Sequence, residues 1–277
     1  MNTSSRSYKE LSIQYFKEVF DLIDGVLTDH GVPYYLVGVT AIDLQMLEQG
    51  IQPKRGTKDI DFAIMVSTLE QYHSIIDDLE AVGFNKVKAP WTVYHPEFKV
   101  AVDILPFGEI EQQDTVQFNE RYTDLHVLGY KEVLGDSVET PIEEKLVGVP
   151  SFPGMVLLKL VAWNDRPEER DNDPVDILRI IDQYFNLNYD EIVEFHYDTF
   201  PEGELDQLLV AAQVLGRKAR KYLSENENLE KRILSILEDN LADVEKSPLA
   251  REWARIHDCE VEYAHSILAA LHKGITE

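Results

Sequence analysis

The sequence predicts an α+β core with a short mixed sheet, α/β-like in its alternation, followed by an all-helical C-terminal domain. Short apolar strands alternate with helices as far as Pro150, and from residue 189 onward the apolar spacing is that of helices. We therefore expect the core to span residues 1–150 and the helical domain residues 151–277. A chain of 277 residues is long enough for two such domains.

The elements of the core follow from apolar periodicity and from turn residues. Gly31-Val32-Pro33 ends a first amphipathic helix, and Thr68 is a suitable N-cap for a later one. The predicted elements are a helix over 8–30, a strand over 34–37, a helix over 40–49, a strand over 58–65, a helix over 68–81, a hairpin of 92–95 and 98–105 around Pro96-Glu97, and strands near 122–128 and 145–149.

The C-terminal domain is predicted to be helical almost throughout. Ser151-Phe152-Pro153 begins a helix that runs through Trp163, and a polar segment follows it. Pro174 suits the first turn of the next helix. Apolar spacing predicts further helices over 205–222, 227–243 and 248–272.

The composition is that of an acidic globular protein. Hydrophobic residues make up 44% of the chain, and the formal net charge is −25 at pH 7. Acidic residues outnumber basic ones in both predicted domains. Because nucleic-acid affinity rests largely on basic contacts with phosphates, extended DNA binding is not expected.

The cellular compartment can be predicted from what the sequence lacks. It has no apolar run of the length that spans a membrane, and its first residues lack the apolar stretch of a secretion signal. Cys259 is the only cysteine, so neither a disulfide framework nor a zinc cluster is expected. We expect a cytoplasmic protein without a membrane partner.

The most informative stretch is the predicted strand over 58–65, in which two aspartates stand two residues apart in an apolar run. Alternate side chains of a strand share a face, so Asp59 and Asp61 lie together and the apolar side chains pack on the other face. Neighbouring carboxylates repel one another, and a divalent cation compensates them. Mg²⁺ prefers carboxylate oxygens together with substrate phosphates, which predicts a metal site here.

A third carboxylate, Asp103, lies in the otherwise apolar strand over 100–105. If the two strands pair, Asp59, Asp61 and Asp103 could hold two Mg²⁺ ions, an arrangement that stabilises in-line phosphoryl displacement. The alternative is that one or more of these aspartates faces solvent, as most aspartates do.

An upstream turn could bind phosphates. Leu36-Val37-Gly38-Val39-Thr40 predicts a strand, a turn and the start of a helix. Glycine lets the backbone approach a triphosphate closely, and a helix N-terminus offers unpaired N–H groups to an anion. Thr40 would add a hydroxyl donor.

Together these stretches resemble a known superfamily. The residues are Gly38-x-Thr40-Ala41, then Arg55-x-Thr57-Lys58-Asp59-Ile60-Asp61-Phe62, then Val102-Asp103-Ile104. They resemble the DNA polymerase β-type nucleotidyltransferases, and among these the AbiEii/AbiGii toxin-type bacterial enzymes. The resemblance covers residues 34–105 and extends over 152–180.

The resemblance implies a nucleotidyltransferase core that transfers an NMP from an NTP and releases pyrophosphate. The implied metal is Mg²⁺, with Mn²⁺ able to replace it, held by Asp59, Asp61 and Asp103. Gly38, Val39 and Thr40 would contact the triphosphate, and Arg55 and Lys58 would steer it.

The second stretch of the resemblance supplies cations from the helical domain. A helix lysine and a later basic–acidic pattern face the nucleotide in the resembling toxins, so the nucleotide would lie between core and helical domain. This implies a catalytic role for Lys159 and nucleotide contacts for Arg166, Arg170 and Asp176. Arg166 and Arg170 are suited to bidentate phosphate contacts.

Lys159 also has a purely structural interpretation. It stands in the apolar run Met155–Leu160, where an unpaired cation is costly, so a carboxylate or a nucleotide phosphate should compensate it. A buried Lys–Asp bridge that docks two helices would do so, and Asp171, Asp173 and Asp176 are all candidates for the partner.

The acceptor is left open by the sequence. The resemblance implies tRNA or a protein hydroxyl, and it allows for a cognate antitoxin among the partners. An acidic protein suits a small polycation, so an aminoglycoside-type acceptor is the main rival. Val39 stands where the family has Gly or Ser, which keeps a non-catalytic binding module with the same fold as a third interpretation.

Overall fold

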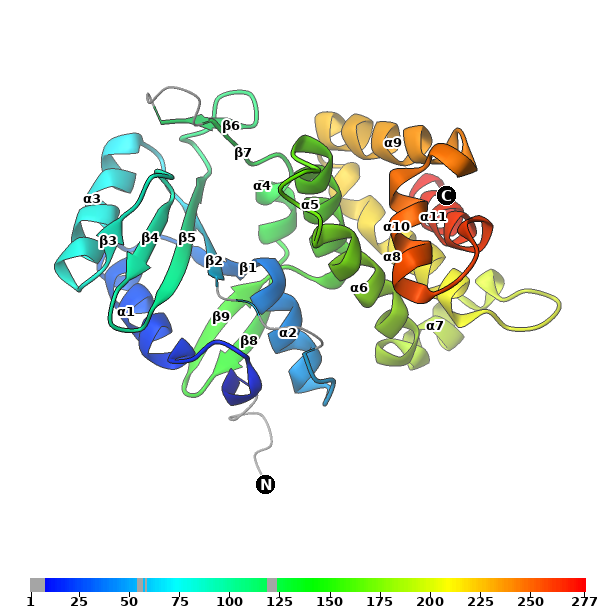
Figure 1. Cartoon of the computed structure of the whole chain (residues 1–277), viewed down its shortest axis with the longest axis horizontal. Coiled ribbons are helices and arrows are strands. Elements are labelled where there is room, and N and C mark those ends of the chain that lie inside the picture. The colour runs from blue at the N-terminus through cyan, green and yellow to red at the C-terminus, as the bar shows by residue number, and fades with distance from the viewer. Residues whose placement is uncertain (1–7, 54–56, 58, 119–123) are drawn as a thin grey trace. The chain divides into compact units, whose positions relative to one another are not determined.

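The computed structural model describes residues 8–53, 57, 59–118 and 124–277. The chain divides into two compact units, Met1–Ser151 and Phe152–Glu277, which are taken one at a time below (Figure 1). Across the described ranges, every helix is too short or too polar to cross a membrane.

The first unit is built on a mixed sheet of seven strands, which confirms the predicted α+β class. Strands β2 and β5 run parallel at its centre, β1 runs antiparallel to β2 and parallel to β9, and the remaining neighbours are antiparallel. In spatial order the strands are β3 (Asn85–Lys86), β4 (Thr92–His95), β5 (Val100–Phe107), β2 (Asp59–Met65), β1 (Tyr34–Val37), β9 (Lys145–Val149) and β8 (Val138–Ile142). A separate pair is formed by β6 (Thr115–Gln117) and β7 (Asp124–His126).

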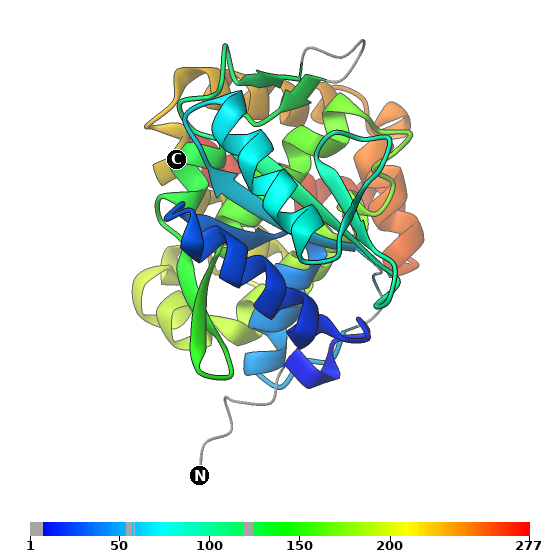
Figure 2. The same cartoon turned by 90° about the vertical axis from the view of Figure 1, so that its left-hand side faces the viewer.

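Two helices cover one face of this sheet, α1 (Phe16–Asp29) and α3 (Leu69–Ala81) (Figure 2). Phe20 of α1 stacks on Phe62 of β2 with ring centroids 6.2 Å apart. On α3, the buried Tyr72 hydroxyl donates to the Ile104 carbonyl at 3.1 Å. Since Phe62 and Asp61 are consecutive on a strand, the apolar face of β2 lies under these helices and its aspartates point the other way.

The remaining helices of the first unit are α2 (Gly38–Glu48) and the short α4 (Tyr130–Leu134). α2 follows β1 directly, without an intervening loop, and most of its side chains are buried. The helix predicted over 40–49 is therefore present, but it begins two residues earlier.

Two predicted boundaries in this unit are wrong for backbone reasons. The first helix begins at Phe16 rather than near residue 8, because Tyr15 has a left-handed φ of 61°. Strand β5 begins at Val100 rather than 98, because Lys99 has a φ of 54° and belongs to the turn. Strand β8 was not predicted; it contains Pro141 and lies at the sheet edge, where proline is tolerated.

The second unit is helical, as predicted. Its helices are α5 (Phe152–Asp165), α6 (Asp173–Leu187), α7 (Tyr189–Phe195), α8 (Gln207–Leu223), α9 (Glu227–Leu241), α10 (Pro248–His257) and α11 (Val261–Thr276). Asp206, Asn226 and Ser247 cap α8, α9 and α10 through their side-chain oxygens. The single helix predicted over 248–272 is two helices, because Asp258 adopts a left-handed φ of 51° and ends α10.

Helices α8 and α11 cross at two glycines. A β-carbon on Gly274 would lie 1.9 Å from the Gln213 carbonyl oxygen, and one on Gly216 would lie 2.3 Å from the Leu271 carbonyl oxygen. Both neighbours are helix backbone, which cannot rotate aside as a side chain can. The two helices therefore pack at a separation that only glycine permits.

We predict that Gly274→Ala lowers the free energy of unfolding by about 2–3 kcal/mol, because the added methyl overpacks a rigid crossing. Urea unfolding monitored by circular dichroism measures the change. The matched control is Gly203→Ala in the same unit, whose added β-carbon would have no heavy atom of the described chain within 4 Å. The control should stay within about 0.5 kcal/mol of wild type; an equal loss in both variants would contradict the role of the crossing.

Candidate active site

The two central strands bring two carboxylates side by side. In the parallel register of β2 and β5, Asp61 lies opposite Asp103 and Asp59 lies opposite Ala101. All three aspartates share one face of the sheet, because β2 and β5 are in register and alternate together. Asp59 is exposed at the start of β2, whereas Asp61 and Asp103 are partly buried.

The C-terminal end of β1 lies beside the Asp61 carboxylate. Val37 pairs with Asp61, so the chain turns from β1 into α2 beside that carboxylate. Gly38 has a φ of 68°, and a β-carbon there would lie 2.0 Å from Asp61 Oδ2. Glycine is required here for two reasons. Any other residue would be strained at this positive φ, and its β-carbon would collide with the Asp61 carboxylate.

Helix α2 begins at this turn, directly beside the Asp61 carboxylate. Its N-cap is Val37, whose side chain cannot accept a hydrogen bond from the first-turn amides. Those N–H groups and the helix dipole form the kind of end that attracts an anion. The arrangement places a potential anion-binding end next to the Asp61 and Asp103 carboxylates.

The side chains of Val39 and Thr40 present no polar group to solvent. Both are buried, and Thr40 Oγ1 donates to the Asp59 carbonyl oxygen at 3.5 Å rather than pointing outward. Thr40 therefore braces the start of β2, and the expectation that its hydroxyl meets a phosphate is corrected. What residues 39 and 40 can offer to a ligand is their backbone amides.

One residue that sequence reasoning missed fixes the orientation of Asp103. Thr92, at the start of β4, pairs with Asp103 in the sheet and donates from Oγ1 to Asp103 Oδ1 at 2.5 Å. On the other side of β5, burial raises the pKa of Tyr72, and the negative charge of Asp103 raises it further. The Tyr72 hydroxyl also donates to the Pro90 carbonyl at 3.1 Å, which anchors the segment leading to Thr92.

The hairpin geometry explains why Thr92 was overlooked. A two-residue turn at Pro96-Glu97 would place Thr92 opposite Ala101, whereas the observed four-residue turn over 96–99 places it opposite Asp103. The sequence shows that Thr92 is a polar residue at the start of a predicted strand. Its partner on the neighbouring strand can be identified only once the register of the two strands is known.

The donor set suits Mg²⁺ in part. Within the residues that the structure describes, no three His, Cys, Asp or Glu side chains converge closely enough to hold a metal by themselves. Mg²⁺ is commonly held by one or two carboxylates, with water and substrate phosphates supplying the remaining oxygens. The paired Asp61 and Asp103 carboxylates meet that requirement, and Asp59 lies two residues away on the same face. The predicted basic residues before β2, Arg55 and Lys58, lie outside the described residues.

Lys159, in the second unit, lies in a buried ion cluster. Its ammonium is 2.6 Å from Asp173 Oδ1 and 2.9 Å from Asp176 Oδ2, and its side chain is only 9% exposed. Burial alone lowers the pKa of Lys159, but the two carboxylates raise it by more, so the pKa lies above its ordinary value. Two of the three candidate aspartates thus share the lysine, which is the helix-docking bridge between α5 and α6 that the sequence left as an alternative.

Arg166 and Arg170 lie between α5 and α6, and the first is half-exposed while the second is exposed. Arg166 Nη1 is 3.5 Å from Glu169 Oε2, and Asp171 is exposed in the same connecting segment. Arg179, a buried residue of α6, was not anticipated. It follows Asp176 by three residues on the same helix, a spacing that the sequence showed but that did not single it out.

Comparisons with known proteins give little further guidance. No protein family and no curated protein matches the chain. Among solved structures, it is similar to the antibiotic-resistance factor ANT(2'')-Ia, whose solution structure is reported to reveal substrate-regulated conformation dynamics. The TM-score is 0.42 at 14% identity, over 82% of this chain and 97% of that one. A likeness this distant assigns no activity, so the site is interpreted from its own residues.

We predict that Gly38→Ala destabilises the first unit more than backbone strain alone would. Gly31→Ala is the matched control, because Gly31 has a similar φ of 63° but its β-carbon would meet no heavy atom of the described chain within 4 Å. The control should cost about 1–2 kcal/mol from its left-handed backbone, and Gly38→Ala should cost about 1–3 kcal/mol more from the collision with Asp61. Thermal and urea unfolding measure both; equal costs would show that Asp61 moves aside freely.

We predict that Lys159→Met lowers the free energy of unfolding by about 3–5 kcal/mol, because it leaves two buried carboxylates without their cation. The triple variant Lys159→Met, Asp173→Asn, Asp176→Asn should recover most of that loss, since it removes the charges together. The pKa of Lys159 is raised above 10.5 in the folded state, so its contribution should persist below that pH and disappear as the pH rises through the folded pKa. Urea unfolding at several pH values tests this; a triple variant no more stable than the single one would contradict it.

Proposed function

We propose that this protein is a Mg²⁺-dependent nucleotidyltransferase that moves an NMP from an NTP to an acceptor hydroxyl. The observation that carries the proposal is the register that sets Asp61 opposite Asp103 and beside the Gly38 turn. Carboxylates that hold a metal next to a phosphate-binding helix end are what phosphoryl-type transfer requires, because its catalysis is mostly positioning and neutralisation of charge.

Each of these residues has a role in the proposal. Asp61 and Asp103, with Asp59 on the same face, would hold the metal, which Mn²⁺ could replace. When bound, the metal would neutralise charge on the triphosphate and on the leaving pyrophosphate. The backbone amides at the start of α2 would bind phosphate oxygens, and Arg55 and Lys58 would steer the triphosphate toward them.

The proposed reaction forms one bond to phosphorus and breaks another. The acceptor oxygen forms a bond to the α-phosphorus, the bond from that phosphorus to the bridging oxygen of the β-phosphate breaks, and pyrophosphate leaves. Asp103 would take up the hydroxyl proton of the acceptor. The hydrogen bond from Thr92 to Asp103 Oδ1 would hold the carboxylate in one orientation for this transfer.

Of the basic residues of the helical unit, only the arginines keep a role in nucleotide binding in this proposal. The charge of Lys159 is already balanced by Asp173 and Asp176, so we assign it to docking α5 against α6 rather than to a catalytic step. Arg166 and Arg170 stay as proposed phosphate contacts, because both are at least partly accessible.

Two different acceptors are proposed, each supported by a different observation. The sequence resemblance favours a toxin-type transfer to tRNA or to a protein hydroxyl, with a cognate antitoxin as a further partner. The net charge of −25 favours a second candidate, a small polycation of the aminoglycoside type, whose local concentration an acidic surface would raise.

We predict that an NTP with Mg²⁺ raises the melting temperature of the wild type, and that Asp61→Asn removes the shift because it removes one metal ligand. Asp29→Asn, on the exposed end of α1, is the matched control and should keep the shift. EDTA should abolish it in every variant. Differential scanning fluorimetry with each of the four NTPs measures the effect; no shift with any of them would sink the enzyme interpretation in favour of a non-catalytic module.

The companion measurement is transfer of label from an α-phosphate-labelled NTP to pools of tRNA, cell protein and aminoglycosides. Asp61→Asn should lower the transfer by about 100-fold or more, as is typical when a group aimed at developing charge is removed. Transfer confined to the aminoglycoside pool would overturn the toxin-type acceptor and support the second candidate.

A further inference from the structure

The exposed aromatic side chains of this protein are concentrated in one short segment of the helical unit. Within the described residues, ten large hydrophobic side chains are exposed, and five of them fall between residues 189 and 205. Of these five, the most exposed are Tyr197 at 71%, Phe195 at 65% and Tyr189 at 54%. Val193 and Leu205 complete the set, which we call the aromatic segment. Large apolar side chains gathered in this way mark interaction surfaces in soluble proteins.

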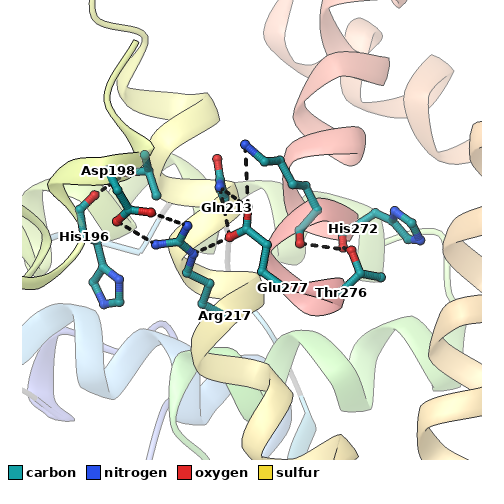
Figure 3. Close-up of polar contacts among 9 residues, drawn as sticks. His196, Asp198, Gln213, Arg217, His272, Thr276 and Glu277 are labelled. Carbon is teal, nitrogen blue, oxygen red and sulfur yellow. Dashed lines mark hydrogen bonds and ion pairs between the residues drawn. The ribbon is translucent and has the colours of Figure 1, made fainter.

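The aromatic segment is held in place by ion pairs rather than left as a loose loop. Arg217 of α8 binds Asp198 through two hydrogen bonds of 2.9 and 2.6 Å, and Lys218 on the same helix pairs with Glu191. Arg217 also donates to Glu277 at 2.5 Å, so its guanidinium is fixed from two sides (Figure 3). A surface fixed before binding loses less conformational entropy when a partner arrives.

Aromatic packing anchors the other end of the segment. Tyr189 meets the buried Phe185 edge to face, with ring centroids 5.9 Å apart, and Phe185 in turn packs against Phe200 at 6.3 Å. One edge of Tyr189 is therefore supported from below while most of the ring faces solvent. Packing against Phe185 thus holds Tyr189 in its exposed position.

The charge that the segment itself carries is negative. The sequence from 189 to 205 contains six acidic residues and neither lysine nor arginine. Asp198 and Glu191 are paired with α8, which leaves Asp190, Glu194, Glu202 and Glu204 exposed and without an ion pair among the described residues. Burial and the nearby Arg217 lower the pKa of His196, so this histidine adds little positive charge at neutral pH.

This combination selects one kind of occupant. Acidic side chains around the rings repel phosphate backbones and anionic lipid headgroups, which disfavours nucleic acid and membrane surfaces. They also repel a second copy of a chain whose net charge is −25. Arginine and lysine are attracted to both components, because they pair with carboxylates and stack on the faces of tyrosine and phenylalanine.

We propose that the aromatic segment is a docking surface for a basic polypeptide segment of a partner protein, one that carries arginine or lysine interleaved with aliphatic side chains. Phe195 and Tyr197 are the anchors, since exposed aromatics of this kind supply most of the energy of an interface. Glu194 and Glu202 supply the charge complementarity that orients the partner.

The test uses the full chain and a short fluorescein-labelled peptide of alternating arginine and leucine, followed by fluorescence anisotropy. The wild type should bind this peptide, and added salt should weaken the binding. Phe195→Ser with Tyr197→Ser should weaken it about tenfold or more. Because both side chains are largely exposed, the double variant should keep its fold, which circular dichroism checks.

Two further variants separate the surface from general acidity. Val138→Ser with Leu146→Ser removes two exposed apolar side chains from the β8–β9 hairpin of the other unit, and it should leave peptide binding unchanged. Glu194→Gln with Glu202→Gln should weaken binding and flatten its salt dependence, because two screened attractions are lost.

Three results would overturn the proposal. Equal peptide affinity in the wild type and in the Phe195, Tyr197 double variant would show binding by overall charge alone. A dimer detected by sedimentation equilibrium and lost in that double variant would make a second copy the occupant. Binding of the wild type to phosphatidylserine vesicles, lost in the same variant, would make it a membrane surface.

Discussion

The candidate site depends on one close approach, that of the Gly38 backbone to the Asp61 carboxylate. The carboxylate occupies the space that any other residue at position 38 would need for its β-carbon. β1 ends there and α2 begins there, so the same contact lies at the first residue of α2. Asp103 lies beside Asp61 through the β2–β5 register, so this close approach allows both carboxylates to lie next to the start of α2.

Local pattern predicted the central strand and the turn, but it could not predict what lies across from them. The alternation around Asp59 and Asp61 is a property of consecutive residues, and the structure has β2 as expected. The contact between Thr92 and Asp103 depends on a turn that is two residues longer than the one expected at Pro96-Glu97. A shift of two residues in the pairing of β4 with β5 leaves every side chain on its predicted face but changes its partner across the strands. The apolar periodicity of the sequence therefore cannot reveal such a shift.

The lysine of α5 illustrates a different limit of sequence reasoning. A buried cation requires compensation, and the sequence offered three aspartates or a ligand for that purpose. The choice is made by where α6 begins: its first residue is Asp173, which brings Asp173 and Asp176 to one face three residues apart and leaves Asp171 in the preceding turn. Helix boundaries are hard to place from sequence, and here such a boundary decides which two of the three aspartates pair with Lys159.

The glycine crossing of α8 and α11 links the interior of the helical unit to its surface. The space that a β-carbon on Gly274 would fill is bounded by the backbone of Arg217 as well as by that of Gln213. The side chain of Arg217 holds Asp198, which follows Tyr197 directly in the chain. Any drift of α8 away from α11 would therefore be transmitted through one arginine to the exposed rings. A buried glycine and a solvent-facing tyrosine are thus joined by one short series of contacts, from Gly274 to α8, from Arg217 to Asp198, and along the chain to Tyr197.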